Sequence, residues 1–139
     1  MKKTLFALFL ATVSTYSLAA DKQQVTVTLA SASTMAQGMA MVLANQMQEQ
    51  GAQVDILLCD KAGDIALKDA GGEVLKPNNV TPAQLLDGAI KKGATASVCA
   101  LYLPNTDYTA DDLRDGITAA NPATMGANLL EAERKVIGF

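Results

Sequence analysis

This chain of 139 residues contains no histidine and no tryptophan, and it has only two cysteines. Without histidine, neither a serine–histidine nor a cysteine–histidine catalytic pair can form. Two cysteines without histidine also fall short of the four nitrogen or sulfur ligands of a structural zinc site. We therefore expect no metal and no cofactor, and the nucleophilic chemistry still open to the chain depends on Cys59 and Cys99.

Basic charge is also scarce. The chain has 11 basic and 14 acidic residues, which gives a net charge of −3. Nucleic acids and anionic membrane surfaces both require a basic binding face. We therefore expect neither of them as a partner.

Residues 1–20 have the pattern of a secretory signal peptide. Two lysines precede an apolar run from Leu5 to Val13, and small residues follow the run. A membrane anchor is the weaker interpretation, because the run is far shorter than the roughly 20 residues of a spanning helix. We expect cleavage after Ala19 or Ala20, a periplasmic or secreted location, and a mature protein that does not associate with the membrane.

Residues 21–139 are long enough for one domain with its own core. Alternating or apolar β-rich segments predict strands at 23–30, 53–60, 95–103 and 134–139. Capping residues and helical periodicity predict helices at 34–50, 82–92, 109–121 and 122–133. Strands that alternate with helices predict a three-layer α/β/α domain with a mostly parallel sheet of four or five strands.

Three segments follow predicted strands, and their sequences are "ASAST", "CDKAGD" and "CALYLPNTDY". In a parallel sheet, ligands bind beyond the carboxyl ends of the strands, so these segments should meet at one edge. Both cysteines belong to this set. We expect the following residues to line a cleft there, although the hydroxyl groups could simply cap a helix: Ser31, Ser33, Thr34, Lys61, Tyr102 and Tyr108.

Cys99 is open to two interpretations. Its neighbours Val98 and Leu101 are typical of a buried strand, in which a cysteine packs as a small apolar residue. A nucleophilic role requires the thiolate, which a helix N-terminus or a nearby cation stabilises. The helix predicted to begin near Thr109 and the ammonium group of Lys61 could supply these two effects.

Cys59 is also open to two interpretations. It could be a buried residue of the strand, or it could lie beside Cys99 and pair with it as a resolving or disulfide partner. An oxidising compartment favours the disulfide, which is possible only if the two Cα atoms lie within about 7 Å. Asp60 should raise the pKa of the Cys59 thiol, which makes Cys59 the poorer nucleophile of the two.

The first predicted helix carries one apolar stripe at helical spacing, which we expect to face the core: Met35, Met39, Val42, Leu43 and Met47. Thioether groups also bind Cu(I). Core packing is the better interpretation, because the third methionine of "MAQGMAM", Met41, lies on a different face of the helix from the first two.

The segment "ASVCALYLPNTDYTADDLRDGI", followed by "LLEAERKVIGF", resembles the C-terminal half of the DsrE-like sulfur-relay family. The motif "DDLRDG" and the final Phe139 fit the pattern of that family, which has one cysteine just after a strand. The opening "VTVTLASASTMAQGMAMVLANQMQEQGAQVDILL" resembles its first strand–helix–strand unit. The chain has "LPNTD" where relay members carry a basic "RRG"-like stretch.

The resemblance implies a DsrE-like fold, a strand that stops near Cys99, and a persulfide carried on that cysteine. It also implies a homo-oligomer whose partner is a sulfur donor or acceptor protein or a small thiol. The leading hypothesis is therefore an exported sulfur carrier. The alternative is a non-catalytic small-ligand-binding or structural module in which both cysteines are structural, and a flavodoxin-like nucleotide binder is a weaker third possibility.

Overall fold

The computed structural model describes residues 22–139, and the predicted signal peptide at 1–20 lies outside this range. Five strands form one sheet in the order β4-β3-β2-β1-β5, and every neighbouring pair is parallel. The strands are β1 (Gln24–Leu29), β2 (Gln53–Leu58), β3 (Thr95–Val98), β4 (Ile117–Ala119) and β5 (Lys135–Gly138). The predicted α/β fold with a sheet of four or five strands is therefore confirmed.

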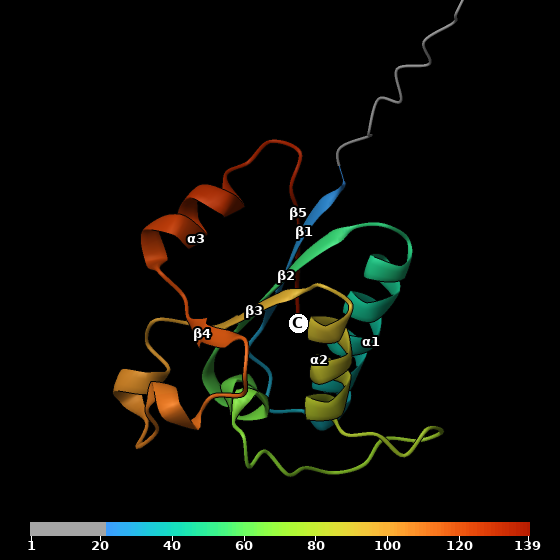
Figure 1. The fold of residues 1–139 in the computed structure, drawn as a ribbon, viewed down its shortest axis with the longest axis vertical. Helices are drawn as coiled ribbons and strands as arrows, with labels where there is room; N and C mark the ends of the chain where they lie inside the picture. Colours follow the sequence, from blue (N-terminus) through green and yellow to red (C-terminus); the bar gives the residue numbers. More distant parts are fainter. Residues whose placement is uncertain (1–21) are drawn as a thin grey trace, which may run out of the picture.

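Three α-helices cover the two faces of this sheet (Figure 1). Helices α1 (Thr34–Glu49) and α2 (Pro82–Lys91) lie on one face, and α3 (Pro122–Leu129) lies on the other. From β1 to β4 the chain steps across the sheet in one direction, so right-handed crossovers keep the connections on one face. The return from β4 to β5 at the opposite edge places α3 on the second face. Within residues 22–139, no helix combines the length and the apolar character needed to cross a membrane.

The main core lies between the sheet and the pair α1 and α2. Side chains alternate between the two faces of a strand, and the residues that point to this layer are apolar and almost fully buried: Val25, Val27, Leu29, Val54, Ile56, Leu58, Ala96 and Val98. The opposite face carries mostly small or polar side chains, and α3 buries none of its residues. Most of the apolar burial that stabilises the sheet is therefore on the face covered by α1 and α2.

The prediction that the methionine stripe of α1 faces the core is wrong for Met35, Met39 and Val42, whereas Met47 packs against the core as predicted. Met35, Met39 and Val42 are 74%, 51% and 42% exposed. The buried face consists instead of small or amide residues together with one methionine: Gln37, Gly38, Ala40, Met41, Ala44 and Asn45. Small residues allow the helix to lie close to its neighbours, so close that a Cβ at Gly38 would lie 2.1 Å from the side chain of Leu75.

The helix predicted at 109–121 is also wrong. This segment forms the short 3-10 helix η3 (Ala110–Asp112) and then strand β4. Gly116 has a φ of +83°, in the left-handed region that ends a helix. Leu113 is buried and forms an isolated antiparallel bridge with Leu67. The chain therefore packs against the core at Leu113, immediately before β4 begins.

Candidate functional site

The two cysteines directly follow neighbouring parallel strands. The register pairs Leu58 of β2 with Val98 of β3, and the next residue on each strand is Cys59 or Cys99. The amide of Cys59 donates a hydrogen bond of 2.8 Å to the carbonyl of Leu29, and the amide of Cys99 donates one of 2.8 Å to that of Leu58. The backbone ladder therefore fixes both cysteines at the carboxyl edge of the sheet, as their place in the sequence predicted.

Strand β3 ends at Val98, although the periodicity predicted that it would continue to residue 103. The amide of Tyr102 donates a hydrogen bond of 2.9 Å to the carbonyl of Cys99, which turns the chain immediately after the strand. Tyr102 is only 4% exposed, because its ring folds back against the molecule. Cys99 therefore lies outside the strand, as the family resemblance implied.

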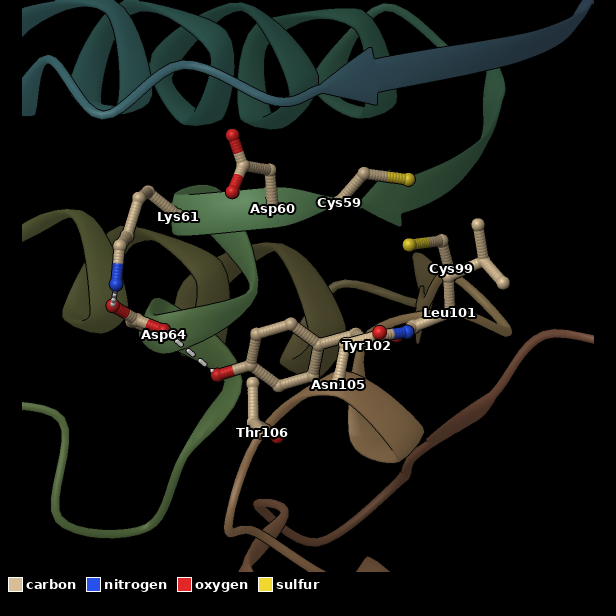
Figure 2. Close-up of a pocket in the computed structure, with 9 residues that line it drawn as sticks. All are labelled: Cys59, Asp60, Lys61, Asp64, Cys99, Leu101, Tyr102, Asn105 and Thr106. Atoms are coloured by element: carbon tan, nitrogen blue, oxygen red, sulfur yellow. Dashed lines mark hydrogen bonds and ion pairs between the residues drawn. The ribbon is translucent and has the colours of Figure 1, made fainter.

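A pocket of about 620 Å³ opens at this edge (Figure 2). The 3-10 helices η1 (Asp60–Ala66) and η2 (Leu103–Asn105) follow the two strand ends and supply part of its wall. The lining residues combine two thiols, three charged groups and a mixed apolar and amide wall: Cys59, Asp60, Lys61, Asp64, Cys99, Leu101, Tyr102, Asn105 and Thr106.

Tyr102 forms one wall of the pocket. Its hydroxyl donates a hydrogen bond of 2.8 Å to Asp64, and its ring stacks on that of Tyr108 with the centroids 6.5 Å apart. The ring lies directly over Gly63, where a Cβ would be 2.4 Å from the nearest ring carbon. Burial, followed by the hydrogen bond to the Asp64 carboxylate, raises the pKa of Tyr102 well above its ordinary value. Tyr102 is therefore a neutral donor.

Both thiols are free and half-buried, and both line the pocket. In Figure 2 their sulfur atoms lie one above the other in the same part of the pocket. Burial is the main cause that raises the pKa of Cys59 to about 12, and the contacts with Cys99 and the nearby charge of Asp60 add to it. Cys59 is therefore held as a thiol at neutral pH.

The charged residues of the pocket come from η1. The ammonium group of Lys61 lies 3.9 Å from the carboxylate of Asp64, and both side chains remain about half or more exposed. Asp60 has a φ of +48°, a left-handed backbone conformation that is uncommon outside glycine. Lys61 thus provides a solvent-accessible cation in the pocket that contains both thiols.

The predicted cleft residues divide into two groups. Lys61 and Tyr102 line the pocket, and Tyr108 stacks against Tyr102. Ser31, Ser33 and Thr34 do not line it: the Ser33 hydroxyl accepts a hydrogen bond from the Ala36 amide as the N-cap of α1, the Ser31 hydroxyl accepts one from the Ser33 amide, and Thr34 begins the helix.

The sequence reasoning did not predict five of the lining residues as part of the cleft: Asp60, Asp64, Leu101, Asn105 and Thr106. They all lie within the segments "CDKAGD" and "CALYLPNTDY", which the topology placed at this edge, so position after a strand was the signal for them. The helix N-terminus expected near Thr109 to act on Cys99 does not exist, because η3 has only three residues. In the described part of the chain, no three His, Cys, Asp or Glu side chains gather as a metal site would require.

A solved structure shares this architecture. The crystal structure of the ychN protein from E. coli matches with a TM-score of 0.71 and 16% sequence identity, over 84% of this chain and 99% of the other. No protein-family model and no curated protein matches the chain. At this identity the likeness establishes the fold, which is DsrE-like.

Proposed function

We propose that this protein is a sulfur carrier in which Cys99 accepts sulfur as a persulfide. The observation that carries the proposal is the position of Cys99, which follows β3 directly and lines an open pocket that also contains a second thiol and a lysine. The DsrE-like fold supports the same interpretation. A cysteine sealed inside the strand would have favoured a packing role instead.

The two cysteines have different roles in this proposal. A thiolate is the attacking species in sulfur chemistry, and the raised pKa of Cys59 keeps that residue protonated at neutral pH. Cys99 lines the same pocket and follows β3 directly, so an incoming sulfur donor can reach it. Cys99 is therefore the acceptor and Cys59 is not.

Sulfur uptake is an exchange at a sulfur–sulfur bond. The Cys99 thiolate attacks the outer sulfur of a low-molecular-weight persulfide, a new sulfur–sulfur bond forms, and the donor leaves as its thiolate. Two electrons move with the broken bond to the leaving thiolate, so the transfer requires no external oxidant or reductant. The carrier then delivers the sulfur to an acceptor thiol by the reverse chemistry.

Intact-mass spectrometry of single-cysteine variants tests the proposal. Reduced Cys59→Ser protein is incubated without oxygen with glutathione persulfide and then desalted. We expect a species heavier by about 32 Da, the mass of one sulfur atom, which a reductant removes. The Cys99→Ser variant should gain no such mass. If neither variant gains sulfur, the protein is better described as a ligand-binding module with structural cysteines.

The partner, the location and the oligomeric state remain predictions. The partner is a sulfur donor or acceptor protein or a small thiol, and Leu101, which is 72% exposed at the pocket, offers an apolar contact for a protein partner. The periplasmic or secreted location rests on the signal-peptide pattern of residues 1–20. In a homo-oligomer, a second copy of the chain would cover the exposed apolar side chains of Met35, Met39 and Val42. Light scattering of the purified protein would test the oligomeric state.

A further inference from the structure

We propose that Cys59 attacks the persulfide on Cys99, forms a Cys59–Cys99 disulfide and releases the carried sulfur as hydrogen sulfide. This inference rests on the proposed function, because it requires sulfur on Cys99 first. It changes the product of the site. Without an acceptor thiol, wild-type protein would reduce the sulfur that it accepts, whereas a chain without Cys59 would store it.

The strand register carries the inference. Cys59 and Cys99 occupy the next position after the paired residues Leu58 and Val98. Neighbouring parallel strands lie about 4.8 Å apart, which falls within the range of about 4.4–6.8 Å between the Cα atoms of a disulfide. The two thiols line one pocket, and in Figure 2 their sulfur atoms point into the same part of it. A disulfide between them therefore requires side-chain rotation rather than movement of the sheet.

The same proximity determines which sulfur is attacked. A persulfide on Cys99 has an inner sulfur bonded to Cβ and an outer sulfur that extends beyond it. The Cys59 sulfur attacks the inner sulfur, the bond between the inner and outer sulfurs breaks, and the outer sulfur leaves with the electron pair of that bond. The Cys59 thiol proton ends on the departing sulfide, so the products are one disulfide and hydrogen sulfide.

The electrons for this step come from the protein. The sulfur of Cys59 is oxidised from a thiol to a disulfide, and the departing sulfur is reduced to sulfide. A dithiol reductant must then cleave the Cys59–Cys99 bond before the chain can accept sulfur again. The site would thus couple sulfur uptake to a dithiol reductant, and not only to a sulfur acceptor.

The protonation of Cys59 sets the order of the two steps. Because its pKa is raised to about 12, Cys59 does not compete with Cys99 for the incoming donor at neutral pH. Burial, the main cause of the raised pKa, remains after Cys99 becomes a persulfide, so Cys59 attacks through the small fraction that is ionised. Sulfide release should therefore follow uptake and become faster as the pH rises.

The test compares wild-type and Cys59→Ser protein, both fully reduced, without oxygen and with glutathione persulfide. We expect wild-type protein to become lighter by about 2 Da, the mass of two hydrogens, and to release sulfide in an amount equal to the protein, above the amount in the Cys59→Ser arm. The Cys59→Ser variant should keep the added sulfur. Lys92→Met, which alters an exposed ion pair with Glu49 outside the pocket, should behave as the wild type.

Each other outcome overturns the inference in a distinguishable way. A wild-type protein that keeps its added sulfur and releases no extra sulfide shows that Cys59 does not resolve the persulfide, while the carrier function stands. A Cys59→Ser protein that takes up no sulfur, with Cys59→Ala as a second variant in case serine impairs folding, removes the carrier function and this inference together. Loss of 2 Da in wild type without a donor would show that residual oxidation, not persulfide chemistry, forms the disulfide.

Discussion

The hydroxyl of Tyr102 donates a hydrogen bond of 2.8 Å to Asp64, and so joins the segment after β3 to the segment after β2. These are the segments that carry Cys99 and Cys59. The bond therefore closes the side of the pocket opposite the sheet edge (Figure 2). The shape of the site depends on this contact as well as on the strands.

Replacement of Tyr102 by phenylalanine should lower stability modestly and keep the pocket wall. The ring and its stacking on Tyr108 remain, but Asp64 loses its donor, which typically costs about 1 kcal/mol. Urea denaturation followed by circular dichroism measures the loss. Tyr108→Phe is the matched control, because Tyr108 is 44% exposed, and it should change stability little. Equal effects of the two changes would contradict the role of the Tyr102–Asp64 bond.

Replacement of Gly63 by alanine should displace the Tyr102 ring. The added methyl group would lie 2.4 Å from two ring carbons, a contact that real side chains do not make. We expect a loss of about 1–3 kcal/mol, together with a shift in tyrosine fluorescence as the ring becomes exposed. Gly71→Ala is the control, because nothing lies within 4 Å of its Cβ position. A Gly63→Ala protein as stable as this control would show that the ring can move at no cost.

The thiol of Cys59 should react slowly with alkylating agents at neutral pH. In the Cys99→Ser variant, burial remains as the main cause that raises the Cys59 pKa, and only the thiolate reacts with iodoacetamide. The pH at which the alkylation rate reaches half its maximum should therefore be higher for the folded variant than for the same variant unfolded in urea. Coincident midpoints in the folded and unfolded protein would contradict a raised pKa. Asp60→Asn should move the folded midpoint downward, because it removes one raising charge.

Replacement of Arg134 by methionine should destabilise the fold, because Arg134 makes its polar contacts on the sheet face opposite α1 and α2. The Arg134 side chain is 5% exposed, pairs with Asp55 and donates a hydrogen bond of 3.1 Å to Thr26. Methionine leaves the largely buried Asp55 carboxylate without its charge partner, at a cost of about 3 kcal/mol. Thermal unfolding measures the change. Lys92→Met, in the exposed ion pair with Glu49, is the control and should change little; an equal loss would contradict this account.

The sequence predicted the sheet and the meeting of the cysteines well, because both depend on local pattern and topology. The β-rich segments around Val27 and Ile56 could hardly form anything but strands, and a parallel sheet brings residues that follow such strands to one edge. The start of α2 at residue 82 was likewise predicted correctly, and the structure adds a capping box in which Thr81 and Gln84 bond reciprocally.

The errors arose where distant residues decide the outcome. Periodicity favoured Met35 and Met39 as core residues, but α1 packs through smaller side chains because Leu75 and α2 lie close to it. The segment with Leu113 has helical spacing, yet its bridge to Leu67 and the left-handed Gly116 turn it into a strand. The end of β3 likewise depends on Tyr102, which requires the space above Gly63.

The strand order has a consequence for how the protein is made. β1 is synthesised first, but its partner on one side is β5, which is formed by residues 135–138. Until that segment emerges, the strand "QVTVTL" has an unpaired edge that another chain could join. The nascent chain can therefore bury its main core while the edge of β1 is still unpaired. The risk of aggregation should fall sharply only when β5 pairs with that edge.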